Sequence, residues 1–276
     1  MPARPQDLIF TLYGEYLLHR KEPIWVGSLI ALLQPFDLSE GAVRTVLSRM
    51  ARKGWLEAHR TGRHAFYNLA PKGRQLLEDG EDRIFHPSWD NPWDGSWFLI
   101  AYSIPEDVRH LRDRLRDRLA WLGFGSLGNG LWISPHDVEE QVQRVAKQLE
   151  IESHLECFQA RRVNKQDAQE LVAKCWDLAT VNQQYLAFSG RWQSELERCS
   201  AGVPTGGVTH EECFTVRFDL IHEYRAFPLI DPYLPRSLLP EQWHGEDAAE
   251  LFNMLHEILK GPADSYVDQI LNTERS

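Results

Sequence analysis

A cluster of cationic and hydroxyl side chains between Ser39 and His64 has the residue types and the spacing that bind a polyanion. Six arginine and lysine residues stand there against two glutamates, a local surplus of four positive charges. The whole 276-residue chain, in contrast, carries a formal net charge of −10. A phosphate backbone responds to local charge, and the acidic surplus elsewhere would repel it. The cluster therefore predicts nucleic-acid contact confined to a short region, with the following candidates: Arg44, Thr45, Ser48, Arg49, Arg52, Lys53, Arg60, Arg63 and His64.

These side chains suit different parts of a DNA duplex. Arginine can bond guanine through two parallel hydrogen bonds in the major groove, and hydroxyls reach bases or phosphates. We expect base contacts from the group Arg44 to Arg49, and phosphate contacts from Arg52 and Lys53, one helical turn later. The segment from Arg60 to His64 would lie along the adjacent minor groove or backbone.

Three predicted helices position the first of these groups. Apolar runs predict two buried helices, over Leu8–Leu18 and Trp25–Leu33. A third helix is expected from Ser39, a suitable N-cap, to about Lys53, because Gly54 is a common helix-stop residue. Apolar residues at helical spacing turn the basic side chains of this third helix outward, and they are Val43, Val46, Leu47 and Met50.

A hairpin is expected directly after the third helix. Two β-prone runs, Trp55–Arg60 and His64–Leu69, flank a turn that contains Gly62. Pro71 suits the first turn of a closing helix that reaches about Phe85. Three helices followed by a hairpin is the order of a winged helix-turn-helix, so residues 1–87 are expected to form a DNA-binding domain. The alternatives are a solvated basic face and a winged helix that binds another protein.

The rest of the chain predicts two further domains. Prolines, asparagine and aspartates make His86–Gly95 a linker. Beyond it, residues 88–165 show the ferredoxin-like β-α-β-β-α-β order, and residues 166–276 are expected to form a mostly helical domain. The α+β class follows. The segments expected in the middle domain are Trp97–Ile104, Glu106–Leu122, Phe124–Leu127, Leu131–Ser134, Pro135–Leu149 and His154–Arg161.

The composition and the motifs that are absent exclude several other classes of protein. No run of 18 uncharged apolar residues occurs, and the N-terminus lacks an apolar secretory segment. The four cysteines form no CxxC pair, which favours a reduced, cytoplasmic protein. No phosphate-binding loop, dinucleotide fingerprint or hydrolase elbow is present. His210–Cys213 with His222 could be drawn as a metal site, but no matched second pair of ligands exists. We therefore predict no catalytic residue, no cofactor and no metal.

Longer motifs, in the same order along nearly the whole chain, resemble the PaaX family of transcriptional repressors. The stretches that carry the resemblance are Leu8–Tyr16, Val43–Trp55, Trp93–Trp97, Gly123–Leu127, Gly130–Pro135, Phe218–Pro228, Asp231–Pro235 and Leu239–Trp243. The resemblance implies a homodimer on double-stranded, palindromic operator DNA of a phenylacetate-type catabolic operon. It also implies release from the operator by an aryl-CoA thioester, phenylacetyl-CoA in the best-known members.

The resemblance places the effector in the region of the central and C-terminal domains, although no motif marks a CoA site. Cations there would meet the CoA phosphates, and a histidine with a tyrosine would line an acyl pocket. The alternative for the same residues is a packed polar network between domains. The candidates are Arg161, Arg162, His222, Tyr224 and Arg225.

The central domain also resembles the small CRISPR-associated nuclease of ferredoxin-like fold, which implies metal-dependent phosphodiester hydrolysis as an alternative function. That family has an aspartate at the end of its first strand. The matching stretch here is Tyr102–Ile104, so Ser103 stands where the acid is expected. Because serine is a poor ligand for a hard divalent cation, we expect the fold without the catalysis.

Overall fold

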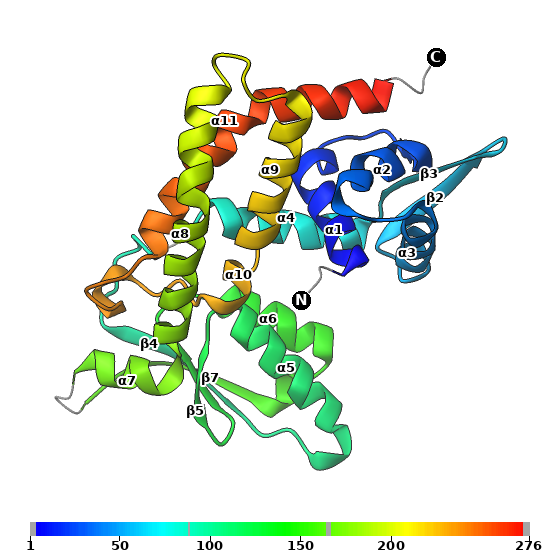
Figure 1. Cartoon of the computed structure of the whole chain (residues 1–276). Coiled ribbons are helices and arrows are strands. Elements are labelled where there is room, and N and C mark those ends of the chain that lie inside the picture. Colours follow the sequence, from blue (N-terminus) through cyan, green and yellow to red (C-terminus); the bar gives the residue numbers. More distant parts are fainter. Residues whose placement is uncertain (1–3, 88, 164–166, 273–276) are drawn as a thin grey trace. The chain divides into compact units, whose positions relative to one another are not determined.

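The computed structural model describes residues 4–87, 89–163 and 167–272 (Figure 1). The chain is a mixed helix-and-strand protein with two small antiparallel sheets, which agrees with the expected class. Its contacts gather in two compact units. The first contains Met1–Phe85, Phe188–Arg225 and Asp247–Ser276, and the second contains His86–Ala187 and Ala226–Glu246. The division into three domains remains a prediction, and its boundaries at 88, 165 and 166 lie outside the described residues.

The N-terminal part of the first unit contains every helix and strand that the sequence predicts there, together with three short additions. The first helix ends in a π-helical turn, a two-residue strand precedes the second helix, and a 3-10 helix follows it. Three strands pair antiparallel in the order β1-β3-β2. The elements are α1 (Pro5–Leu12), η1 (Tyr13–Leu17), β1 (Ile24–Trp25), α2 (Val26–Leu33), η2 (Gln34–Phe36), α3 (Glu40–Arg52), β2 (Leu56–Thr61), β3 (His64–Leu69) and α4 (Pro71–Phe85).

Three C-terminal helices complete the first unit: α8 (Leu178–Gly202) from Phe188 onward, α9 (His210–Tyr224) and α11 (Gly245–Asn272). Helix α9 begins with a capping box, in which Thr209 and Glu212 each bond the other's backbone N–H. The N-terminal helices pack on α9 through aromatic rings, since Phe36 stacks on Phe218 at 3.9 Å between ring centroids. The first unit is therefore built from both ends of the chain.

The second unit contains strand, helix, two strands, helix and strand in the predicted sequence order. Its antiparallel sheet has the order β5-β6-β4-β7, and α5 and α6 pack side by side on one face (Figure 1). These elements are β4 (Ser96–Tyr102), η3 (Glu106–Val108), α5 (Arg109–Trp121), β5 (Gly125–Gly128), β6 (Leu131–Ser134), α6 (Glu139–Leu149), η4 (Glu152–His154) and β7 (Leu155–Arg161). Shorter helices follow: α7 (Ala168–Cys175), α10 (Phe227–Ile230) and η5 (Arg236–Leu238).

Helix α6 begins four residues later than the sequence predicts. The Ser134 hydroxyl accepts a hydrogen bond from the His136 N–H at 3.2 Å. A hydroxyl that binds nearby backbone in this way offers the chain an alternative to the helix. The predicted start at Pro135 is therefore wrong, and Val138 is the N-cap.

Part of the predicted linker is core rather than a free connection. Trp89 is 4% exposed, and its indole N–H donates to Asp231 Oδ2 at 3.3 Å. Its ring also makes T-shaped contacts with the rings of Tyr185 and Tyr233 within the second unit. No helix in the described part of the chain has the length and apolarity needed to cross a bilayer.

Candidate nucleic-acid interface

Helix α3 is defined at both ends by its own sequence. At the N-terminus the Ser39 hydroxyl accepts the Ala42 N–H at 3.3 Å, which satisfies one of the free donors of the first turn. At the C-terminus Gly54 has φ +72°, the left-handed conformation that glycine adopts most easily. The Gly54 N–H bonds the Ala51 carbonyl at 3.0 Å and the Trp55 N–H bonds the Met50 carbonyl at 3.0 Å, a complete Schellman motif. The chain can therefore leave α3 at a set angle and enter the hairpin.

The two faces of α3 differ in burial as the sequence predicts. The apolar stripe is 6% exposed or less at each position, and it comprises Val43, Val46, Leu47 and Met50. The opposite face is solvent-exposed at all six predicted contact positions, which are Arg44, Thr45, Ser48, Arg49, Arg52 and Lys53. Because the stripe anchors the helix, the basic face is turned to solvent.

Two residues of this face already take part in local bonds. Arg44 Nε donates to Glu40 Oε1 at 2.8 Å in an exposed i,i+4 ion pair. Thr45 Oγ1 donates to the Gly41 carbonyl at 2.8 Å, which leaves the hydroxyl oxygen as an acceptor. Exposed pairs of this kind contribute only about 0.3–0.5 kcal/mol, so releasing Arg44 from Glu40 costs little.

The hairpin extends beyond the three helices and lies next to α3 (Figure 1). Its strands pair in register from Leu56↔Leu69 to Thr61↔His64, with a two-residue turn whose first residue, Gly62, has φ +60°. A turn of this length needs a positive φ there to match the twist of the strands. The three predicted contacts of this segment, Arg60, Arg63 and His64, are all exposed.

A hollow of about 620 Å³ separates the exposed face of α3 from β2 and β3. Ser48 and Arg52 of α3 line one side, and Arg60 of β2 lines the other. Glu57 also lines it, so the charges of Arg52, Arg60 and Glu57 sum to +1. The helix and the hairpin thus present one continuous surface that hydrogen-bond acceptors such as phosphates would fit.

Models of one protein family match three consecutive parts of the chain. They are a PaaX-like protein over residues 4–73, the PaaX protein central Cas2-like domain over 90–172 and the PaaX-like protein C-terminal domain over 176–269. The transcriptional repressor PaaX of Escherichia coli (strain K12) is 33% identical over 272 residues, which are 98% of this chain and 84% of that protein. The chain belongs to the PaaX family.

A solved structure supports the same fold for this PaaX-family chain. An uncharacterized protein from Mycobacterium tuberculosis superposes with a TM-score of 0.60 at 22% identity, covering 98% of this chain and 99% of that one. At this identity the likeness extends to the fold alone. The predicted family membership is therefore confirmed by sequence matches, and the fold match is consistent with it.

The five predicted effector residues of this family member fall in different units. His222, Tyr224 and Arg225 stand at the C-terminal end of α9 in the first unit, whereas Arg161 ends β7 and Arg162 follows it in the second. Arg161 Nη2 lies 3.8 Å from Asp94 Oδ2, and Arg162 Nη1 donates to the Asp167 carbonyl at 2.8 Å. The candidates therefore form two sets, one in each unit.

The α9 candidates are held by neighbours in the first unit. Tyr224 is 1% exposed and its ring stacks on Phe252 at 4.0 Å. His222 Nδ1 lies 2.7 Å from Thr11 Oγ1, and burial, with a smaller effect of the Arg225 charge, lowers the His222 pKa to about 4. Burial also lowers the pKa of Arg225. His222 is therefore a neutral imidazole near pH 7, able to bond a hydroxyl but not to attract an anion.

The residues of the alternative metal site are used elsewhere. Glu212 caps α9 through Thr209, and His222 bonds Thr11. Within the ranges that the structure describes, no three histidine, cysteine, aspartate or glutamate side chains gather as metal ligands would.

Sequence reasoning missed the residues that hold this interface from behind. The buried Tyr13 donates its hydroxyl to the Tyr67 carbonyl of β3 at 3.2 Å, and Phe10 meets the Trp55 ring edge-on at 5.7 Å. Burial raises the pKa of Tyr13, so this hydroxyl stays a donor. No sequence pattern marked these contacts, although Glu15, a charged residue inside the same apolar run, indicated that a buried form of this segment would need a charged partner elsewhere.

Proposed function

We propose that the protein is a transcriptional repressor that binds double-stranded operator DNA through a winged helix-turn-helix formed by α1 to α3 and the β2–β3 hairpin. The main support is that all nine basic and hydroxyl candidates are exposed. They lie on one face of α3 and at one end of the hairpin, next to the hollow that α3 and the hairpin share. A helix of this kind fits the major groove, and the hairpin would follow the adjacent backbone. The E. coli relative named as a transcriptional repressor supports the regulatory role.

Regulation by an aryl-CoA thioester is part of the same proposal. The family resemblance supports a cytoplasmic homodimer on the palindromic operator of a phenylacetate-type catabolic operon, released by phenylacetyl-CoA or a related thioester. Such a protein has a conformation that binds the operator and a conformation that does not. A ligand lowers DNA affinity only when it has the higher affinity for the conformation that does not bind the operator. For the thioester we keep the exposed Arg161 with Arg162, and His222 with Arg225, as candidate contacts; Tyr224 would need to leave its stack on Phe252 to take part.

For the second unit we propose a ferredoxin-like fold without nuclease activity. The element order and the antiparallel sheet order β5-β6-β4-β7 support the fold, as does the family description of a Cas2-like central domain. At the end of β4 the exposed Ser103 stands where a metal-binding aspartate is expected. A fold of this kind carries no activity by itself, and its chemistry resides in the site residues.

A gel-shift titration with the chain's own upstream DNA tests the proposal. At two defined salt concentrations we expect a specific shift that phenylacetyl-CoA reverses and that free CoA does not. Arg191, an exposed cation of α8 paired with Glu223 at 2.9 Å, offers a control outside the interface through Arg191→Ala. The absence of a shift at every salt concentration would refute DNA binding. A shift that no aryl-CoA reverses would refute only the effector.

A further inference from the structure

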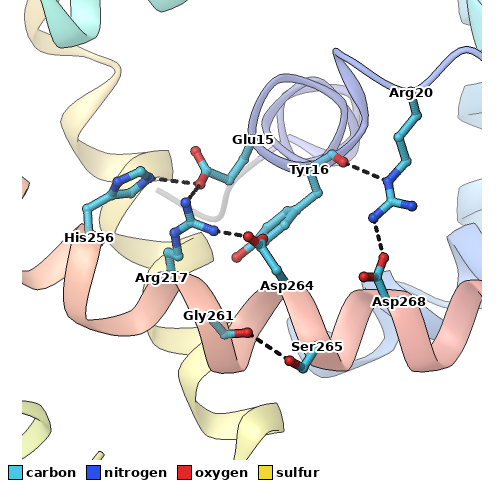
Figure 2. Close-up of polar contacts among 9 residues, drawn as sticks. All are labelled: Glu15, Tyr16, Arg20, Arg217, His256, Gly261, Asp264, Ser265 and Asp268. Atoms are coloured by element: carbon cyan, nitrogen blue, oxygen red, sulfur yellow. Dashed lines mark hydrogen bonds and ion pairs between the residues drawn. The ribbon is translucent and has the colours of Figure 1, made fainter.

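A buried ionic cluster joins the N-terminal helices to α9 and α11 (Figure 2). Arg217 of α9 has a side chain that is 4% exposed, and it donates from Nη2 to Glu15 Oε1 at 2.8 Å and from Nη1 to Asp264 Oδ1 at 3.2 Å. His256 Nε2 of α11 lies 2.8 Å from the same Glu15 oxygen. The Glu15 side chain is also 4% exposed. One carboxylate from the N-terminal segment is therefore held by two groups from the C-terminal helices.

The segment that carries Glu15 also holds the hairpin. Glu15 lies in the π-helical turn η1, and such turns are rare and concentrate at functional sites. Tyr13, two residues earlier in that turn, bonds the β3 backbone at Tyr67. Tyr16, the next residue, places its ring 5.4 Å from the Arg217 guanidinium. Because η1 continues α1, and α1 contacts α3, one N-terminal segment connects the cluster to both parts of the proposed DNA interface.

Net stability is a weak explanation for such a cluster. Removing two charges from water offsets most of their attraction, and apolar residues of similar volume are often as stable in the same place. The guanidinium, in contrast, bonds carboxylates only when they lie within its planar fork. The stack of Phe36, from η2, on Phe218 adds apolar contact between the N-terminal helices and α9, and apolar contact is less directional than a bond from a guanidinium to a carboxylate. A contact with this directional requirement is suited to alignment of the elements that it joins.

We propose that Glu15 and Arg217 are positioning residues that lock α3 and the β2–β3 hairpin to α9 and α11, so that the first unit meets DNA as one body. The inference rests on the proposed DNA binding and adds to it how the reading elements are held. Any event that separates Glu15 from Arg217 would free the hairpin from the C-terminal helices without touching a DNA contact.

The double variant Glu15→Gln/Arg217→Met tests the lock, because it removes both charges with side chains of similar volume. We expect at least a tenfold loss of operator affinity with an unchanged slope of log affinity against log salt, since every phosphate contact remains. Hydrogen exchange without DNA should show that the β3 amides lose protection while those of α9 and α11 keep it. A matched control, Glu195→Gln/Arg198→Met, neutralises an exposed pair of α8 at 2.8 Å and should behave as wild type.

The outcomes of these experiments decide whether Glu15 and Arg217 position the hairpin. A folded double variant with wild-type affinity and wild-type β3 protection overturns the lock. If the double variant does not fold, Asp264→Asn is the second test. It weakens the contact between Asp264 and Arg217, and the Asp264 side chain is 45% exposed. This single variant should show the same changes in smaller measure, and an unaltered β3 would again overturn the lock. If wild type binds no operator DNA, the proposed function fails, and hydrogen exchange still decides the lock.

Discussion

The exposed side chains of α3 and the hairpin differ in what each would contribute to DNA binding. A contact to phosphate adds affinity for every sequence, whereas a contact to a base edge adds discrimination between sequences. Arg49 and Arg52 are both exposed on α3, and their spacing of three residues makes them neighbours on the helix surface. Their equal charge and different positions make them a matched pair for separating the two roles.

Arg52→Ala should weaken binding to operator and unrelated DNA alike. Each lost phosphate contact should lower the salt slope by about 1, because one fewer counterion is released. Arg49→Ala should instead reduce the preference for the operator by about 1–3 kcal/mol if Arg49 reads a base. Titrations of both DNAs over a range of salt measure the two effects. Identical behaviour of the two variants would contradict the division of roles.

Burial of His222 predicts a pH dependence of stability. Its folded pKa of about 4 lies below the ordinary value of 6.5, so the unfolded chain binds the proton more tightly. The contribution is complete above pH 6.5 and is lost as the pH falls from 6.5 towards 4. After discounting for partial exposure, we expect the free energy of unfolding to drop by about 1 kcal/mol between pH 7 and pH 5 through this residue.

Urea unfolding at the two pH values, with His222→Gln as comparison, measures this contribution. The variant loses the Thr11 contact at both pH values and should show a smaller drop between them. An equal drop in both proteins would assign the pH dependence to other groups.

At the scale of elements, α3 depends on two glycines in opposite ways. Gly54 ends the helix at φ +72°, and Gly41 lies in its first turn with ordinary helical geometry. A Cβ at either position would meet no atom within 4 Å, so packing does not differ between them. The backbone conformation alone should decide the sign of each substitution.

Gly54→Ala should lower the free energy of unfolding by about 1 kcal/mol, because alanine resists the left-handed conformation. Gly41→Ala should raise it by up to about 1 kcal/mol, because glycine in a helix costs backbone entropy. Chemical denaturation of the two variants measures both. If both variants changed the free energy of unfolding in the same direction, the left-handed conformation at Gly54 would not be what ends α3.

At the scale of the whole molecule, the proposed dimer restricts the operator. Two recognition helices reach successive major-groove faces only when their half-sites are one helical turn, about 34 Å, or a multiple apart. Inserting 5 base pairs between the operator half-sites should therefore abolish cooperative binding, and inserting 10 should restore part of it. Gel shifts with the three DNAs measure this. Equal binding to all three would indicate that each protomer binds alone.

Local patterns in the sequence determined the elements and the exposed chemistry. Helical spacing of Val43 to Met50, the Ser39 cap and the glycines at 54 and 62 predicted α3 and the hairpin, because each signal acts within a few residues. The same locality explains why all nine contact candidates are exposed, and why a long series of motifs identified the PaaX family.

Only the tertiary structure decided what holds these elements. Glu15 and Arg217 are 202 positions apart in the chain, and no local pattern indicates that one will bond the other. The placement of α9 and α11 against the N-terminal helices, the burial of Trp89 and the hollow beside α3 have the same origin. Burying a charge or an aromatic ring requires a partner, but the choice of partner depends on the packing of the whole unit.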